Sequence, residues 1–191
     1  MSIQRDYKDL KNRSEYYSEA GDTALAQGNN INHIEEKDTT KPVFHTSGGR
    51  IVYGGGGITP DYIVKSNNIT SYTTDLLKNN IFYQFILGFL NQNEETIKNK
   101  YGKNLRSFVR NYQLPANTMG NFIGFAKSKG VKFNEKDFNT DEKYIATRLK
   151  AQIARNFWKN EGWYMVMQSI DRQLEKAENL FGEAKDLAKL K

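Results

Sequence analysis

The spacing of apolar residues along the chain changes near residue 70. Before that point, short β-favouring stretches predict strands at residues 43–45, 51–53 and 62–64. The turn residues Ser47–Gly49 separate the first two stretches, so we expect a β-hairpin there. After Ser71 apolar residues recur at steps of three and four, which is the spacing of a helix face. The sequence therefore predicts an α+β protein, with short N-terminal strands or a hairpin followed by a mainly helical C-terminal domain.

The first part of the helical region is divided by residues that begin or end helices. An apolar face runs over 76–90, and Ser71 or Thr73 is the candidate cap. The Leu114–Pro115 pair ends a second, basic stretch. A short helix is expected next, and Gly130 is placed to end it.

Two more helices are expected toward the C-terminus. Asn139 and Glu142 have the spacing of a capping box, which predicts that a helix begins there. Apolar residues continue at helical spacing to Phe157, and Glu161–Gly162 is the expected joint. A last apolar stripe follows, made of Trp163, Val166, Met167, Ile170, Leu174, Ala177 and Phe181.

Residues 1–40 differ from both of these regions. They are polar and contain Gly21, Gly28 and the pair Asn29–Asn30. Such a composition is typical of a long exposed loop or an insertion.

Overall composition narrows the classes of protein. Hydrophobic residues make up 38% of the 191 residues and aromatic residues 13%, which excludes a disordered composition. No window approaches the roughly 18 consecutive apolar residues of a membrane span, and the N-terminus lacks the apolar core of a signal peptide. The chain has no cysteine, which excludes disulfides, thiolate metal sites and a cysteine nucleophile.

Charge is uneven along the chain. Residues 1–70 carry 8 basic and 9 acidic side chains, whereas residues 71–191 carry 20 and 13, a net charge of +7. The densest basic segment contains no acid and consists of Lys98, Lys100, Lys103, Arg106 and Arg110. A basic stripe can bind nucleic acid or an anionic membrane. Interspersed Lys and Glu elsewhere favour a solvated helix face instead, so we expect no nucleic-acid partner.

Four consecutive glycines at 54–57 are the most unusual local feature. A phosphate-binding loop needs a lysine and a Ser or Thr directly after the last glycine. Here Ile58–Pro60 follows, and Pro60 has no N–H to donate to a phosphate. A tight structural turn packed against neighbouring backbone is the favoured interpretation, and no cofactor is expected.

Neither histidine marks a clear site. His33 lies near Glu35, Glu36 and Asp38, and this group could hold a metal ion, but its spacing matches no ordered metal site and a solvated acidic loop is the favoured interpretation. His45 lies on a predicted strand, where packing or surface exposure is commoner than general-base catalysis. We therefore assign no metal ligand.

The evidence for catalytic residues and for a stacking platform is equally weak. None of the nine serines lies in a Gly-x-Ser-x-Gly elbow, and Lys65–Ser66 is not a Ser-x-x-Lys arrangement. No local sequence holds a nucleophile against a base, so we assign no catalytic residue. Aromatic residues could form a stacking platform, but their helical spacing favours core packing; they are Phe157, Trp158, Trp163 and Tyr164.

One ordered block of residues carries a family resemblance. It consists of Gly49 and Arg50, Val52 and Tyr53, the glycines Gly54, Gly55, Gly56 and Gly57, and then Pro60 and Asp61. This order resembles a signature of the carboxyl-terminal processing (tail-specific) serine peptidases. The segment from Ser2 to Tyr7 resembles the part of that family that follows its catalytic lysine. The helical tail is also similar, through Phe138, Ile145, Leu149, Lys150, Ile153, Ala154, Trp158, Asp171 and Ala177.

The resemblance implies that the catalytic residues lie upstream of the region that this chain resembles. In that family a serine nucleophile is paired with a lysine base and a PDZ domain often gates substrate C-termini, and all three lie upstream of the part that this chain resembles. The chain is then expected to be a non-catalytic C-terminal region. Residues 1–66 would be a loop and short strands that complete a peptidase core, and residues 71–191 a helical domain.

The resemblance also implies partners and a place in the cell. The partners would be the missing upstream protease and PDZ domains and the protein or peptide substrates of the parent enzyme. Family members usually work in the periplasm or cell envelope. The alternative from the residues alone is a free-standing basic helical module that binds a protein or an anionic partner.

Overall fold

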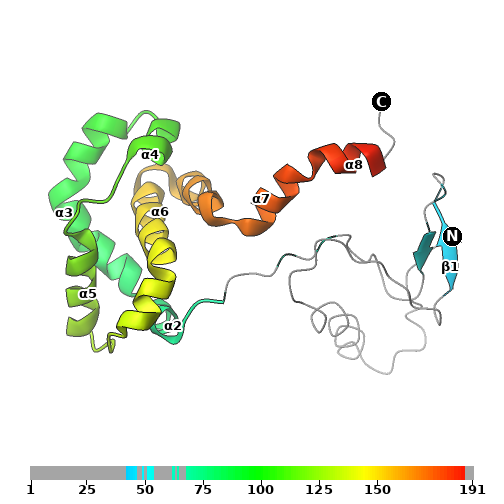
Figure 1. Cartoon of the computed structure of the whole chain (residues 1–191). Coiled ribbons are helices and arrows are strands. Elements are labelled where there is room, and N and C mark those ends of the chain that lie inside the picture. The colour runs from blue at the N-terminus through cyan, green and yellow to red at the C-terminus, as the bar shows by residue number, and fades with distance from the viewer. Residues whose placement is uncertain are drawn as a thin grey trace, which may run out of the picture. The chain divides into compact units, whose positions relative to one another are not determined.

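A computed structural model describes residues 42–46, 49, 51–53, 62, 64 and 68–187 (Figure 1). Several predictions lie outside these residues: the polar loop at 1–40 with its His33 cluster, and the motif residues Arg50, Gly54–Gly57 and Pro60–Asp61. The chain divides into two compact units. We call Met1–Ser66 with Arg172–Lys191 the hairpin unit and Asn67–Asp171 the helical unit. This division places the last part of the predicted helical domain, 172–191, with the N-terminal residues.

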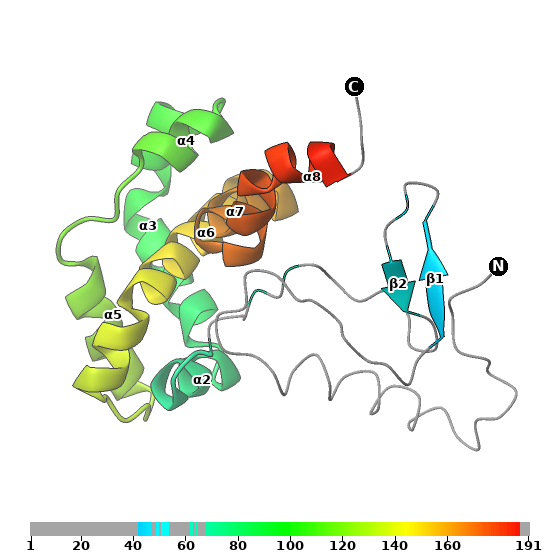
Figure 2. The ribbon, with the colours of Figure 1, turned by 45° about the vertical axis from the view of Figure 1, so that its right-hand side comes forward.

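The predicted hairpin is confirmed. Strands β1 (Val43–His45) and β2 (Ile51–Tyr53) pair in antiparallel register, with Phe44 opposite Val52 (Figure 2). Gly49 lies between them with φ +80°, a conformation that glycine adopts at little cost, and its N–H donates to the Thr46 carbonyl.

The third predicted strand, at 62–64, is wrong. Neither Tyr62 nor Val64 lies in a strand, and both contact the C-terminal helices of the same unit. The Tyr62 hydroxyl donates to the Glu183 carboxylate at 2.6 Å, and the Gln173 side-chain amide donates to the Val64 carbonyl at 3.3 Å. These side-chain and backbone contacts take the place of strand pairing at the two described residues.

The C-terminal part of the hairpin unit contains α7 (Arg172–Asn179) and α8 (Phe181–Leu187). The sequence predicts one apolar stripe from Trp163 to Phe181, but the helix that begins it ends at Met167 and a short 3₁₀ turn, η1 (Gln168–Ile170), intervenes. Phe181 is 70% exposed. The predicted continuous stripe is therefore wrong.

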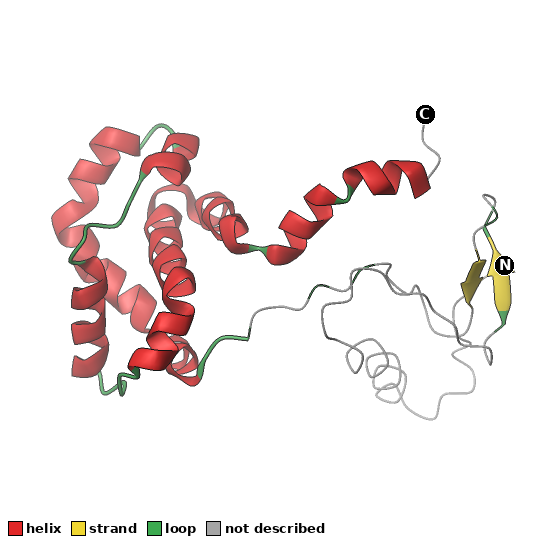
Figure 3. Cartoon of the chain, in the orientation of Figure 1, coloured by secondary structure: helices red, strands yellow, loops and turns green. Residues whose placement is uncertain are grey.

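The helical unit is built around one long element. Its helices are α2 (Ser71–Lys78), α3 (Ile81–Tyr101), α4 (Leu105–Asn111), α5 (Thr118–Ser128) and α6 (Glu135–Met167). Helix α6 packs against α2, α3 and α4, and α3 also contacts α4 and α5 (Figure 3). Among the described residues every buried apolar side chain lies between Tyr72 and Val166, so the helical unit closes a core of its own. The α+β, mainly helical class predicted from the sequence is confirmed.

The apolar face predicted over 76–90 is divided between two helices. Thr70, rather than Ser71 or Thr73, caps α2, because its hydroxyl accepts the N–H of Thr73. The helix stops at Asn79, and Asn80 has φ +55°, a left-handed conformation that asparagine tolerates better than most residues. Helical spacing persists across the break, which is why the sequence gives no sign of it.

Of the next two predicted helix boundaries, the end of α5 is confirmed and the start of α6 is wrong. Helix α5 ends at Ser128, and Gly130 follows with φ +85°, as the C-terminal glycine predicts. The capping box at Asn139 is wrong, because α6 already begins at Glu135. Asn134 is the cap, and its side-chain oxygen accepts the N–H of Asp137 at 3.1 Å. An available cap five residues upstream therefore starts the helix earlier.

Two carboxylates of α6 fix the start of α2. Asp141 accepts hydrogen bonds from the N–H and the hydroxyl of Thr70 at 2.8 and 2.7 Å, and Asp137 accepts the Ser71 hydroxyl at 2.9 Å. A negative charge at a helix N-terminus is favourable because unpaired N–H groups point outward there. Asp141 thus joins the first and last helices of the unit.

The environment of Asp141 shifts its titration. Burial alone would raise the pKa of this carboxyl, but the nearby hydroxyl of Thr73 and the hydrogen bonds from Thr70 outweigh burial and lower the pKa. The Thr73 hydroxyl itself makes no well-formed hydrogen bond. The charged form of Asp141 is therefore the one that the folded unit stabilises.

No helix in the part of the chain that the structure describes has both the length and the apolar character needed to cross a bilayer.

Candidate binding cleft

Helix α6 reverses direction near its C-terminal end. Trp158 (φ −122°, ψ 17°) and Lys159 (φ 55°, ψ −139°) are not helical, and they divide α6 into a first limb, 135–157, and a second limb, 160–167. The sequence predicts this joint at Glu161–Gly162, two to four residues too late. No glycine or proline marks the true turn, so the sequence carries no local signal for it.

Gly162 has a different role from the one predicted. A Cβ at this position would lie 2.6 Å from the Ala154 carbonyl oxygen and 3.1 Å from the Trp158 Cβ. Residues eight apart on a straight helix are about 12 Å apart, so this contact requires that the second limb folds back onto the first. The missing side chain lets the two limbs touch.

Trp163 on the second limb packs against two arginines of the first. The guanidinium carbons of Arg148 and Arg155 lie 5.0 and 5.9 Å from the centre of the indole ring. Arg148 also lies 5.4 Å from the Phe82 ring and donates to the Tyr144 hydroxyl at 2.8 Å. Such cation–π contacts favour fixed positions for the two arginines over free motion in solvent.

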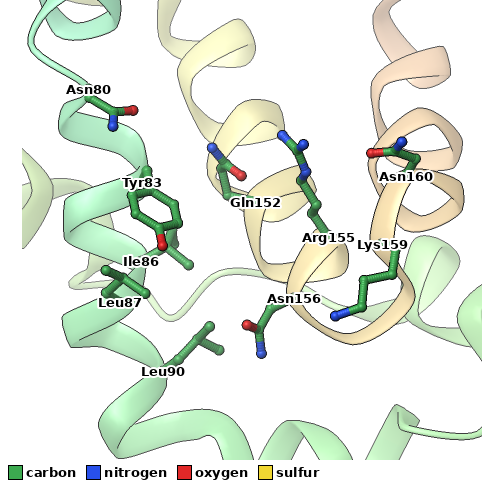
Figure 4. Close-up of a pocket in the computed structure, with 10 residues that line it drawn as sticks. All are labelled: Asn80, Tyr83, Ile86, Leu87, Leu90, Gln152, Arg155, Asn156, Lys159 and Asn160. Carbon is green, nitrogen blue, oxygen red and sulfur yellow. The ribbon is translucent and has the colours of Figure 1, made fainter.

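A cleft of about 620 Å³ lies between α3 and the reversal of α6 (Figure 4). Its side chains come from two helices that face one another across the opening. The α3 side contributes Asn80, Tyr83, Ile86, Leu87 and Leu90, and the α6 side contributes Gln152, Arg155, Asn156, Lys159 and Asn160.

The two walls of the cleft differ in chemistry. On α3, Ile86 and Leu90 are buried, while Tyr83 and Leu87 are 49% and 47% exposed. The α6 wall carries amides and the two cations Arg155 and Lys159, and none of the described residues that line the cleft is a carboxylate. One wall can therefore bury apolar groups while the other attracts negative charge.

The predicted motif residues are placed only in part. Gly49 lies in the hairpin connection, Val52 and Tyr53 lie in β2, and the remaining motif residues fall outside the described ones. His45 is exposed at the end of β1. Within the described residues no group of three or more His, Asp and Glu side chains could hold a metal ion. The described motif residues belong to the hairpin unit and the cleft belongs to the helical unit.

The basic segment lies at the end of α3 and through α4. All five of its cations are exposed, in agreement with a solvated helix face; they are Lys98, Lys100, Lys103, Arg106 and Arg110. None of these residues lines the cleft. Exposure of these side chains is common to a solvated face and to a binding stripe, so the absence of a nucleic-acid partner stays a prediction.

The helical aromatics divide between packing and exposure. Phe157, Trp158 and Trp163 are partly buried against the core, as the packing interpretation predicts, whereas Tyr164 is 62% exposed. The Trp158 ring packs at a tilt of 50° against that of Phe108, with ring centres 5.1 Å apart. These rings therefore form no free stacking platform.

Lys150 shows how a lysine on α6 can be structural. Its Nζ donates to the carbonyls of Val109 and Tyr112 at 2.8 and 2.7 Å, where α4 ends. Burial lowers the pKa of this ammonium group. The two carbonyls would otherwise remain unpaired at the helix end, so Lys150 joins α4 to α6 and is not a free base.

The helical unit is similar to proteins of one family. Residues 72–159 match the model of a family described only as a family of unknown function (DUF8443). This stretch runs from Tyr72 in α2 to Lys159 in the reversal and contains every residue of the cleft lining except Asn160. Neither a curated protein nor a solved structure matches the chain.

Proposed function

We propose that this chain is the non-catalytic C-terminal region of a carboxyl-terminal processing serine peptidase. The observation that carries the proposal is the hairpin, in which Val43 and Ile51 are 51% and 53% exposed. Two strands of three residues make a weak sheet by themselves. The motif residues Gly49, Val52 and Tyr53 lie in this hairpin, which supports a role as the last strands of a larger peptidase sheet.

In this proposal the chemistry belongs to upstream domains. The Ser/Lys dyad and the PDZ domain are partners of this chain, and the parent enzyme acts near protein C-termini. The periplasm or cell envelope is then the place where the protein works. The helical unit, which closes its own core, is an accessory domain that binds polypeptide.

A second candidate is a free-standing basic helical binding module. The observation that favours it is that the buried apolar residues of the described part all lie within the helical unit. Such a unit needs no upstream sheet to fold. The peptidase proposal requires that the hairpin pairs with an upstream domain, whereas the free-standing module does not require it. An experiment can measure this difference.

The test uses the coding sequence that adjoins the chain. That sequence is expected to encode a PDZ domain and a Ser/Lys peptidase segment, which should co-purify with the chain and cleave unstructured peptides only in its presence. The double variant Val43→Asp/Ile51→Asp should abolish co-purification, while Tyr164→Asp, at an exposed site of the helical unit, should not.

Two results would contradict the proposal. One is an adjoining sequence that encodes no such peptidase. The other is cleavage by the purified chain alone that survives repurification and is lost on substitution of one of its serines.

A further inference from the structure

We propose that the cleft between α3 and α6 is a docking site for an acidic amphipathic segment of another polypeptide. The inference concerns the site and not the parent protein. Peptide binding could therefore fail while the relation to the peptidases holds, and the reverse is equally possible.

The α3 wall is suited to apolar side chains. Tyr83 and Leu87 are one turn apart on the same face of α3 and about half exposed, and the buried Ile86 and Leu90 lie beside them in the lining. A large apolar residue exposed beside the core gains when a partner covers it, at roughly 25 cal/mol per Å² of apolar area. The wall thus offers adjoining anchor positions for a partner's leucines.

The α6 wall selects the charge of the partner. Arg155 and Lys159 are the charged residues of the lining, and the lining residues that the structure describes include no carboxylate. Arg155 contacts the ring of Trp163, which limits its freedom before a partner arrives. Apolar anchors on one side and cations on the other match a helix that carries leucines on one face and carboxylates along its edge.

Backbone strain at Lys159 supports the same site. Its φ of 55° and ψ of −139° fall in a region that glycine occupies readily and that residues with a Cβ rarely adopt. Glycine would remove this strain, yet a lysine occupies the position and its side chain lines the cleft. The energetic cost is understandable if the ammonium group has a use there.

The openness of the cleft favours a polypeptide over a small ligand. Sites for small molecules usually enclose most of the ligand surface. In this cleft, by contrast, the side chains of Tyr83 and Leu87 on α3 are about half exposed to solvent. Nucleic acid is the competing anionic partner. A phosphate backbone would use the two cations but gain little from Leu87 and the other apolar side chains of α3.

The probe is a fluorescein-labelled synthetic peptide of about 18 residues, long enough to form a helix, with leucines at i, i+3, i+4 and i+7 and glutamates elsewhere. Its controls are a scrambled peptide of the same composition and a version with every glutamate replaced by lysine. The full chain should bind the first peptide in fluorescence anisotropy, and each control at least about tenfold more weakly.

Variants locate the site. Arg155→Gln/Lys159→Gln should weaken binding about tenfold, since two partly exposed charge contacts together are worth roughly that factor. Leu87→Asp should abolish binding, because it removes an apolar anchor and repels the glutamates of the peptide. Lys98→Gln/Lys100→Gln, the same charge change as the first variant but on the basic segment, should alter binding less than about twofold. Lys159→Gly should both raise the thermal midpoint of unfolding by about 4 °C and weaken binding of the peptide.

Several results would overturn the proposal. These are absence of binding by the native chain, equal binding of the lysine peptide, equal loss in the Lys98/Lys100 control, or displacement of the peptide by an oligonucleotide at physiological salt. Unchanged far-ultraviolet circular dichroism of each variant separates loss of the site from loss of the fold.

Discussion

The hairpin and the helical unit differ in how completely each buries its apolar residues. In the helical unit, Phe108, Phe122 and Ile145 are fully buried, and α6 contacts three other helices. In the hairpin, Val43 and Ile51 remain about half exposed on strands of three residues. The helical unit therefore has its own source of stability, while the described part of the hairpin shows little.

This difference in burial indicates which kind of function fits each region. A unit with a closed core can carry a binding site on its surface without losing its fold, as the cleft on α3 and α6 does. A hairpin with exposed apolar side chains is better explained by pairing and packing with another domain.

The largest effect is expected from Phe108→Ala. Phe108 is fully buried and stacks on Tyr112 at 4.6 Å, so its loss should lower the free energy of unfolding of the helical unit by about 3–5 kcal/mol. Ile51→Ala in the hairpin should change the free energy of unfolding of the helical unit by less than about 0.5 kcal/mol. Urea unfolding followed by circular dichroism makes both measurements, and equal effects would remove the contrast between the two regions.

A smaller effect is expected from Asp141→Asn. The charged carboxylate accepts two hydrogen bonds from Thr70, and its replacement should lower the free energy of unfolding by about 2 kcal/mol at neutral pH. Glu142→Gln, on an exposed neighbour, is the control and should have little effect.

The pH dependence gives Asp141 a second test. Because folding lowers its pKa, the stabilisation by Asp141 is fully present above the ordinary value near 3.8 and is lost as the pH falls through the lower folded value. The difference between native and Asp141→Asn unfolding free energies should therefore shrink below about pH 4. A difference that stays constant down to pH 2 would show that the charge of Asp141 does not act in this way.

An effect of similar size is expected from Gly162→Ala, and the smallest from its control, Gly124→Ala. The new Cβ would lie 2.6 Å from the Ala154 carbonyl oxygen, so the limbs of α6 must move apart, at a cost of about 1–3 kcal/mol. Gly124→Ala in α5, where nothing lies within 4 Å, should instead stabilise by up to about 1 kcal/mol, because alanine favours helix. Thermal melts that move in the same direction for both variants would argue against the close approach of the limbs.

Local chemistry explains which parts of the fold were predictable. Turn residues and β-formers predicted the β1–β2 hairpin, and Gly130 predicted the end of α5, since each acts through its own backbone preference. The sequence pattern does not predict the division at Asn80 and places the joint of α6 two to four residues too late, because both breaks put a non-glycine residue at positive φ. Such conformations are imposed by packing between helices, and no local pattern announces them.

The cleft was beyond prediction for a related reason. Its walls lie about seventy residues apart in sequence, and the packing of α6 on α3 brings them together, while the reversal of α6 adds Lys159 and Asn160. The charge pattern of the sequence singles out the cations of 98–110, whereas the cleft uses Arg155 and Lys159, the last two of five cations between Lys143 and Lys159. The arrangement of charges in space, and not their density along the chain, marks this site.

Hydrogen exchange on the whole chain tests the central contrast most directly. Amides of α2 to α6 should exchange slowly, because their helices surround a closed core, and amides of β1 and β2 should exchange at nearly unprotected rates. Addition of the proposed upstream peptidase domain should then protect the strands and leave the helices unchanged. Strands as strongly protected as α3 and α6 in the chain alone would contradict the account and favour a complete, free-standing protein.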